Sequence, residues 1–235
     1  MTPVADPTLD LERKIAGVGR GRRPNGHSGV VIGCDEVGRG ALAGPVAVGL
    51  CVIDVRAARE VPKGLRDSKM LSEPRREELA PVAMSWGIAH AVGYASAQEI
   101  DEKGISVCLG LAGKRALAEL HTAGVDVMAA TIILDGHFDW LTPVLSTPLS
   151  IRTQVKADRD CASVAAASVI SKVARDRMMI DHDVDFQGYG WARNKGYASE
   201  EHRDAILSLG ATELHRHTWL SKLMGSAELP LEFTA

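Results

Sequence analysis

The sequence predicts an α/β protein with a mixed β-sheet flanked by helices and a helical extension at the C-terminal end. Two apolar segments of strand length come first, strand and helix patterns then alternate, and the last part of the chain carries helix patterns alone. This order of elements is typical of a sheet covered by helices. No segment has the composition of a linker, so we expect one folded domain.

The composition is that of an ordinary globular protein. The 235 residues are 46% hydrophobic and 24% charged, which excludes disordered and collagen-like chains. A net charge of −3 argues against a protein that coats nucleic acid by bulk charge, although a local basic groove remains compatible with it. Four cysteines lack the spacing of a zinc or redox site, and we expect them reduced and buried: Cys34, Cys51, Cys108 and Cys161.

Five short apolar segments predict strands. Residues 30–34 and 46–53 come first and are nearly free of charge, which indicates strands buried on both faces. The other three predicted strands are residues 88–95, 129–134 and 151–155.

Helix signals lie between and after these strands. A helix is expected to begin after Ser72, and Pro81 should kink or end it. Ser96 opens a capping box three residues before Glu99, ahead of a helical pattern that ends near His121. Two later helices are expected over residues 161–179 and from the cap Ser199 to Gly210.

The two ends of the chain differ from its middle. Residues 1–28 are polar and basic and lack the apolar core of a signal peptide, so we expect a flexible basic tail. Residues 29–224 are expected to form the folded domain and residues 225–235 a C-terminal tail. The longest apolar stretch, residues 41–53, is too short to cross a bilayer. We therefore expect a soluble cytoplasmic protein with no membrane partner.

Acidic residues lie where predicted strands end. Asp35 and Glu36 follow the first strand, Asp135 follows the fourth, and Asp158 precedes the long helix. Strand ends are where sites assemble in open α/β sheets. Carboxylates held close together repel one another unless cations lie between them, and hard ions such as Mg²⁺ or Mn²⁺ prefer oxygen ligands. Two such ions can activate water and stabilise a leaving oxygen at phosphorus.

Each acid taken alone also has a structural interpretation, as a turn former or a helix cap. Successive side chains of a strand point to opposite faces. Asp35 and Glu36 therefore converge only if the chain bends nearby, at Gly38 and Gly40.

A run of motifs then resembles a known family. The first is a D-E-x-G-R-G segment made of Asp35, Glu36, Gly38, Arg39 and Gly40. The later ones, in chain order, begin at Asp67, Leu134, Lys156, Asn194 and Gly210. Together they resemble type 2 ribonuclease H, the ribonuclease HII family, over about residues 29–220.

The resemblance implies a fold and a reaction. The fold is the ribonuclease H-like mixed five-stranded sheet, with residues 29–224 as the catalytic domain. Asp35, Glu36, Asp135 and Asp158 would be the catalytic and metal-binding acids, holding two Mn²⁺ or Mg²⁺ ions. The enzyme would hydrolyse the RNA strand of RNA–DNA hybrids and cut on the 5′ side of single ribonucleotides in duplex DNA. Its products would be 5′-phosphate and 3′-hydroxyl ends.

Recognition of one ribonucleotide requires a probe of its 2′-hydroxyl. Gly38 and Gly40 allow the backbone to approach a sugar closely, and Arg39 can hold a phosphate. The family resemblance assigns the stacking contact with the sugar or base to Tyr197, whose alternative role is simple packing.

Further phosphate contacts are expected from Lys69, Ser168, Lys172 and Arg175. The last three share one helix face. The alternative is that Lys172 pairs with Asp176 on a solvated face.

Other interpretations of the whole chain stay open at this point. A junction resolvase of ribonuclease H-like fold would also carry four acids, and a non-catalytic hybrid-binding module would bind without metal. Residues 228–233 faintly resemble a sliding-clamp peptide, which predicts a weak clamp contact or else a disordered tail. We expect a monomer.

Overall fold

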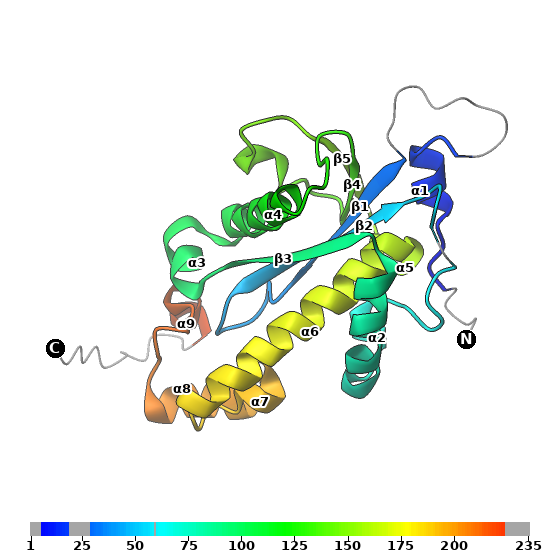
Figure 1. Ribbon diagram of the computed structural model, residues 1–235. Helices are drawn as coiled ribbons and strands as arrows, with labels where there is room; N and C mark the ends of the chain where they lie inside the picture. The colour runs from blue at the N-terminus through cyan, green and yellow to red at the C-terminus, as the bar shows by residue number, and fades with distance from the viewer. Residues whose placement is uncertain (1–5, 19–28, 59, 224–235) are drawn as a thin grey trace.

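The computed structural model describes residues 6–18, 29–58 and 60–223, and a five-stranded mixed sheet forms its centre (Figure 1). The strands lie in the order β3-β2-β1-β4-β5. Their bounds are Val30–Val37 for β1, Val46–Asp54 for β2, Ala89–Ala95 for β3, Thr131–Asp135 for β4 and Ser150–Gln154 for β5. β1, β4 and β5 run parallel, whereas β2 is antiparallel to both of its neighbours. The predicted fold class is confirmed.

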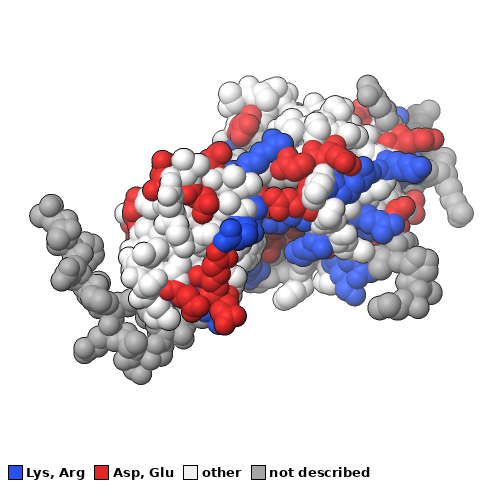
Figure 2. All heavy atoms as spheres, turned by 90° about the horizontal axis from the view of Figure 1, so that it is seen from below, with Lys and Arg blue, Asp and Glu red and all other residues white. Residues whose placement is uncertain are grey.

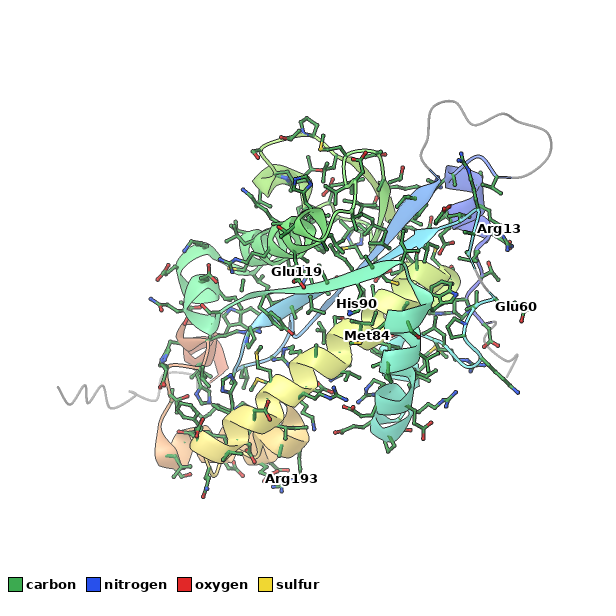
Figure 3. All side chains as sticks on the ribbon, viewed as in Figure 1. Arg13, Glu60, Met84, His90, Glu119 and Arg193 are labelled. Carbon is green, nitrogen blue, oxygen red and sulfur yellow. The ribbon has the colours of Figure 1, made fainter. Side chains whose placement is uncertain are left out.

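Helices cover both faces of this sheet. The long helix α6 and the shorter α2 pack on one face, and α4 packs on the other (Figure 1). Side chains fill the space between these layers (Figure 3). The main helices are α2 (Glu73–Trp86), α3 (Ala97–Lys103), α4 (Ile105–Thr122) and α6 (Ala162–Asp185). The shorter ones are α1 (Asp10–Ile15), α5 (Ala157–Asp160), η1 (Ser68–Met70) and η2 (Thr142–Val144).

The expected helical extension at the C-terminal end is present. It consists of α7 (Trp191–Asn194), α8 (Glu200–Leu209) and α9 (His217–Leu223). These helices enclose a separate buried cluster around Trp191 and Ile206, which also takes in Met179 near the end of α6. The extension is thus packed onto the end of the long helix.

Gly33 in β1 allows α6 to lie directly on the sheet. A Cβ at this position would stand 2.2 Å from the carbonyl carbon of Ser163, a distance that no side chain tolerates. The alanine-rich start of α6 and this glycine therefore bring helix and strand backbones together.

The local helix signals are confirmed. The Ser96 hydroxyl accepts the Glu99 N–H at 3.1 Å, and the Glu99 carboxylate accepts the Ser96 N–H at 3.0 Å. Ser199 caps α8 by accepting the His202 N–H at 3.1 Å. Gly210 ends that helix with a φ of +81°, a conformation that favours glycine.

Of the two expectations for Pro81, that it ends the helix is wrong, because α2 continues to Trp86, and that it kinks the helix stays a prediction. Leu79 and Ala83 are buried on either side of the proline, in the same cluster as α6. Tertiary packing of this face therefore stabilises the helix across the missing hydrogen bond.

The expectation of a flexible tail over residues 1–28 is corrected for residues 6–18. This segment contains α1, and Leu9 and Ala16 are buried with exposures of 3% and 2%. Leu11, Ile15 and Val18 pack against the same cluster, but these few apolar residues did not signal a packed helix in a polar and basic stretch. Residues 1–5 and 19–28, and the predicted C-terminal tail over residues 225–235, lie outside the described residues.

The four cysteines are free and buried, as expected. Among the described helices, none combines the length and the apolar character needed to cross a membrane.

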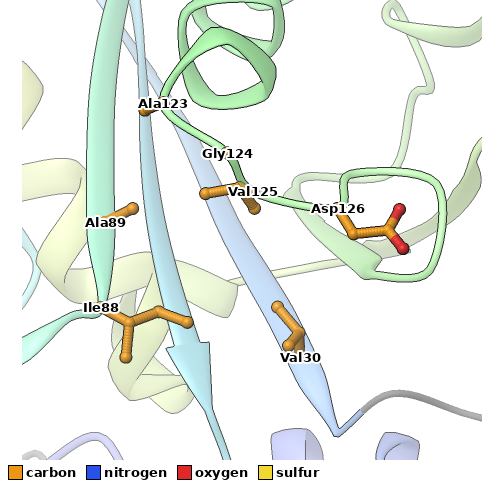
Figure 4. Close-up of a pocket in the computed structure, with 7 residues that line it drawn as sticks. All are labelled: Val30, Ile88, Ala89, Ala123, Gly124, Val125 and Asp126. Carbon is orange, nitrogen blue, oxygen red and sulfur yellow. The ribbon is translucent and has the colours of Figure 1, made fainter.

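A pocket of about 370 Å³ opens where β1 begins, lined by Val30, Ile88, Ala89, Ala123, Gly124, Val125 and Asp126 (Figure 4). The acids of β1 lie toward the other end of that strand. The pocket is therefore separate from the acidic site.

Candidate active site

The register of β1 and β4 brings acids together. These parallel neighbours pair from Val31 with Thr131 to Cys34 with Leu134. Asp35 and Asp135 therefore follow the last pair on adjacent strands. Asp158 joins them from α5, directly after β5.

Asp135 ties the end of β4 to α5. Its Oδ1 accepts the N–H of Ala157 at 2.7 Å and, more weakly, the N–H of Asp158 at 3.4 Å. Lys156 turns the chain ahead of these residues with a φ of +60°. These hydrogen bonds hold the start of α5 so that the Asp158 backbone lies beside the Asp135 carboxylate.

Burial and repulsion between carboxylates raise the pKa of three of these acids, Asp35, Glu36 and Asp158. Asp35 is 3% exposed, and burial together with the charge of Glu36 raises its pKa well above the ordinary value. Burial also raises the pKa of Glu36, against the opposing effect of Arg39. Burial, followed by the charges of Asp135 and Asp67, raises the pKa of Asp158 to about 6. When these carboxyl groups are ionised, the neighbouring cations therefore do not fully balance their negative charge.

Lys69 reaches into this group of acids. Its Nζ lies 3.6 Å from Oδ2 of Asp158. Burial alone would lower the pKa of Lys69, but the charges of the surrounding acids outweigh it and raise the pKa. Lys69 therefore lies beside the acids and contacts a carboxylate, and its expected contact with phosphate stays a prediction.

Asp67 is a buried acid that the sequence analysis did not assign to the site. It is 6% exposed, accepts the N–H of Lys69 at 2.9 Å, and hydrogen-bonds with the Asp158 carboxyl. The D-S-K motif contained the signal, but nothing in the sequence showed that this acid faces Asp158.

The acids suit a hard divalent cation in chemistry, since every donor is a carboxylate oxygen. As the side chains lie, no three acidic, His or Cys groups in residues 6–18, 29–58 and 60–223 converge tightly enough to ligate one ion. One reason is that β1 continues as a strand through Asp35 and Glu36 to Val37. The expected bend begins only at Gly38, so the adjacent acids leave opposite faces of the strand.

The two glycines of the turn over residues 38–40, here named the glycine turn, differ in their surroundings. Gly38 has a φ of +80°, and a Cβ there would lie 2.1 Å from Nε of Arg175. Gly40 is exposed, and a Cβ there would meet no atom within 4 Å. Protein packing therefore explains Gly38, whereas the space over Gly40 is open to a ligand. The Arg39 side chain between them is 53% exposed and lies 3.5 Å from Glu36.

Tyr197 comes to this turn from the C-terminal extension. Its hydroxyl accepts the Gly38 N–H at 3.2 Å. Lys172 and Arg175 lie 5.6 and 5.4 Å from the centre of its ring. Nδ1 of His202 lies 2.9 Å from the Tyr197 carbonyl oxygen. The predicted neighbourhood of the glycine turn and Tyr197 is therefore present.

Ser168 is too buried to touch a substrate, with an exposure of 1%. Its hydroxyl oxygen lies 2.9 Å from Ser68 Oγ, and its hydrogen-bonding contact with the Asp35 carboxyl opposes the rise in the pKa of Asp35. Ser168 therefore contacts both the Asp35 carboxyl and the Ser68 hydroxyl from inside the protein.

Lys172 does pair with Asp176, at 2.5 Å, but on a largely buried face rather than a solvated one. Burial lowers its pKa despite this partner. Arg175 was predicted to contact phosphate, but its side chain is fully buried. Its guanidinium group donates instead to the carbonyl oxygens of Pro45, Lys195 and Ala43.

Arg216 is a second buried cation without a carboxylate partner in the part of the chain described. It donates to the carbonyl oxygens of Gly38 at 2.7 Å and Arg39 at 2.9 Å, and burial lowers its pKa to about 9. Two arginines thus hold the glycine turn from below. Their burial could not be predicted from the sequence, because it depends on tertiary packing beneath the glycine turn.

Charge is mixed over the face seen in Figure 2. Acidic side chains gather near its middle, and Lys and Arg side chains lie on either side of them. With a net charge of −3, contact with phosphate depends on individual cations rather than on one basic surface.

Comparison with known proteins concerns this same part of the chain. A sequence model described as Ribonuclease HII matches residues 32–222. Ribonuclease HII of Streptomyces avermitilis is 41% identical over 217 residues, which cover 92% of this chain and 85% of that protein.

Two solved structures have similar folds. RNase HII in the PCNA:RNase HII complex from Archaeoglobus fulgidus has a TM-score of 0.63 and 28% identity, covering 81% of this chain and 95% of that one. Bst-RNase HIII in complex with Mn²⁺ has a TM-score of 0.63, covering 92% of this chain and 82% of that one. At 20% identity, this second likeness concerns the fold alone.

The matched region contains all four acids, the glycine turn and Tyr197. The chain belongs to the ribonuclease HII family and is an endoribonuclease of ribonuclease H type 2.

Proposed function

We propose that this enzyme hydrolyses the RNA strand of RNA–DNA hybrids and cuts duplex DNA on the 5′ side of a single embedded ribonucleotide. The products carry 5′-phosphate and 3′-hydroxyl ends. The observation that carries this proposal is the bond between the Tyr197 hydroxyl and the Gly38 N–H, three residues beyond Asp35. It supports the proposal because it holds a hydroxyl group close to the acids and to the open space over Gly40, and the sensing of one 2′-hydroxyl requires a hydrogen-bonding probe.

We assign two divalent ions, Mn²⁺ or Mg²⁺, to Asp35, Glu36, Asp135 and Asp158, whose side chains would have to move closer together than in this structure to hold them. The chemistry that such ions supply is activation of water and stabilisation of the leaving oxygen at phosphorus. The all-oxygen donor set and the raised pKa values of three of these acids support the assignment. Asp135 holds the Asp158 backbone in place, and Lys69 offsets part of the negative charge.

Around the ribonucleotide, the open space over Gly40 admits the sugar edge and the exposed Arg39 holds a phosphate. Tyr197 presents its ring to the sugar and its hydroxyl as a hydrogen-bonding probe. Ser168 and Lys172 contribute indirectly, because their own bonds keep them within the protein.

The test uses an end-labelled DNA duplex with one ribonucleotide, beside an all-DNA duplex and an RNA–DNA hybrid. We expect one cut immediately 5′ of the ribonucleotide, several cuts in the hybrid RNA, and none in the all-DNA duplex. A ligase assay for the 5′-phosphate checks the product ends. Cleavage on the 3′ side, or equal cleavage of the all-DNA duplex, would contradict the proposal.

We also infer a weak sliding-clamp contact through residues 228–233, which lie outside the described residues. The solved complex of a related RNase HII with PCNA supports it. In surface plasmon resonance with the cognate clamp, the full chain should bind, and a chain that ends at residue 224 should show no binding. Light scattering on the free enzyme should give the mass of a monomer.

A further inference from the structure

Residues 6–16, here named the N-terminal segment, lie outside the region matched by the family model yet contact the surroundings of the acids. The segment touches the chain between Asp158 and Ser163, which joins α5 to α6 and is here named the α5–α6 elbow. It also touches the loop that leads to Lys69. Both contacts come from residues that the sequence analysis placed in a flexible tail.

Backbone bonds join the segment to the elbow. The Thr8 N–H donates to the Asp160 carbonyl at 3.1 Å, and the Ala162 N–H donates to the Thr8 carbonyl at 2.9 Å. Thr8 thereby forms a parallel bridge with Cys161. The elbow is bonded on either side of Cys161, so its path is fixed by the segment.

Glu12 adds a buried side-chain contact to the same elbow. It has no exposed surface, and its Oε1 accepts both the N–H of Ser163 at 3.0 Å and the hydroxyl of Ser163 at 2.8 Å. Burial raises its pKa. Its Oε2 has no hydrogen-bond partner among the residues described. Burying a carboxylate costs free energy. A flexible tail would not bury Glu12 in this way.

The elbow is held from its other side by β1. A Cβ on Gly33 would stand 2.2 Å from the Ser163 carbonyl carbon, so the elbow lies directly on the strand, two residues before Asp35. Asp158 begins the elbow. The N-terminal segment therefore contacts the elbow that begins at Asp158, and this same elbow lies on the strand that carries Asp35.

A second tie reaches the loop of Lys69. Nε of Arg66 donates to Oδ1 of Asp6 at 2.8 Å, and Leu9 shares a buried cluster with Leu65. The ion pair is exposed and contributes little stability by itself. It nevertheless links the segment to the lysine that lies beside Asp158.

We propose that Glu12 is a positioning residue for the cleavage reaction: through Ser163 it holds the elbow so that Asp158 stands correctly relative to Asp35. This inference rests on the proposed function, because it concerns the acids assigned to the ions. Glu12 touches neither substrate nor reacting atoms. The competing explanation is that the N-terminal segment only stabilises the fold.

Three variants of α1 separate the two explanations. Glu12→Ala removes both bonds to Ser163, and we expect kcat to fall by about ten- to a hundredfold, as small misplacements of catalytic groups do. KM for the duplex should stay unchanged, because Tyr197 and the glycine turn are remote from the segment. Glu12→Gln keeps an oxygen for both bonds and should retain kcat within about twofold. Asp10→Asn, an exposed acid on the same helix, is the matched control and should change nothing.

A second readout does not depend on activity. Calorimetric titration of the substrate-free protein with Mn²⁺ should show weaker binding for Glu12→Ala than for the wild type, and wild-type binding for Glu12→Gln. Both assays are run at a temperature where circular dichroism shows each variant to be folded. Equal kcat and equal Mn²⁺ affinity in folded Glu12→Ala would overturn the proposal and leave the segment a purely stabilising element.

Ser163→Ala covers the case in which Glu12→Ala does not fold. It removes one of the two bonds and keeps the backbone N–H, so we expect a fall of a few fold in kcat with unchanged KM; an unchanged kcat would again overturn the proposal. Failure of the wild type to cleave would instead count against the proposed function. In that case the Mn²⁺ titrations would still decide the role of Glu12.

Discussion

Asp158 illustrates how the behaviour of one residue in this enzyme depends on its surroundings. Burial, Asp135 and Asp67 together raise its pKa to about 6, although Lys69 lies nearby. In a metal-free protein, the folded state therefore binds a proton on this carboxyl more tightly than the unfolded state does. The linkage between protonation and folding makes this property measurable.

We predict that Asp158 makes metal-free stability depend on pH. Its folded pKa of about 6 lies above the ordinary value of 3.8, so its stabilising contribution is complete below about pH 4 and is lost as pH rises through about 6. The unfolding free energy of the wild type, relative to Asp158→Asn, should fall by on the order of 2 kcal/mol across this range. Urea denaturation in chelator at several pH values measures the difference. A difference that stays flat or rises with pH would contradict the assignment.

Tyr197 is the second residue whose role is testable alone. Tyr197→Phe removes the hydroxyl that accepts the Gly38 N–H but keeps the ring. We expect cleavage at a single embedded ribonucleotide to slow by about tenfold, the equivalent of one hydrogen bond, with little change in duplex binding. Cleavage rates and filter binding on the same duplex measure both. Equal losses of binding and cleavage would remove Tyr197 from ribonucleotide recognition.

At the scale of elements, the contact between β1 and α6 supports the strand that carries Asp35. It brings Ser168 behind Asp35 and places the start of α6 over the strand. The absence of a side chain at Gly33 makes this contact close enough.

Gly33→Ala should therefore destabilise the fold. Its new Cβ would meet Ser163 at 2.2 Å, and such overpacking lowers the unfolding free energy by about 3 kcal/mol. Gly40→Ala is the matched control for stability, because its Cβ would meet no atom within 4 Å, and it should leave the unfolding free energy within about 0.5 kcal/mol. Thermal and urea unfolding compare the two. Similar effects of both substitutions would show that the β1–α6 contact is less tight than described.

Elements with local signals were predictable, and elements stabilised by distant contacts were not. The capping box of α3 and the cap at Ser199 depend on residues three apart, so the sequence revealed them. Helix α1 depends on burial of Leu9 and Glu12 against segments far along the chain. The continuation of α2 through Pro81 depends in the same way on packing against α6.

At the scale of the whole molecule, the site joins segments that are far apart in sequence. Adjacent parallel strands bring Asp35 to Asp135, and the C-terminal extension brings Tyr197 to Gly38. The family motifs identified these residues. Neither the motifs nor the charge pattern indicated that Arg175 is buried beneath the turn or that Asp67 faces Asp158, since both facts depend on tertiary packing.

The central claim is that the four acids perform metal-dependent cleavage rather than support the fold. Asp135→Asn tests it most directly, because the asparagine keeps an Oδ1 acceptor for the N–H of Ala157 and so preserves the cap of α5. The measurement is cleavage and binding of one duplex with a single ribonucleotide, in Mn²⁺, in Mg²⁺ and in chelator. We expect the wild type to cut only with metal, and the folded variant to bind the duplex at least as tightly without cutting it. Wild-type cleavage by Asp135→Asn, or cleavage by the wild type in chelator, would contradict the claim.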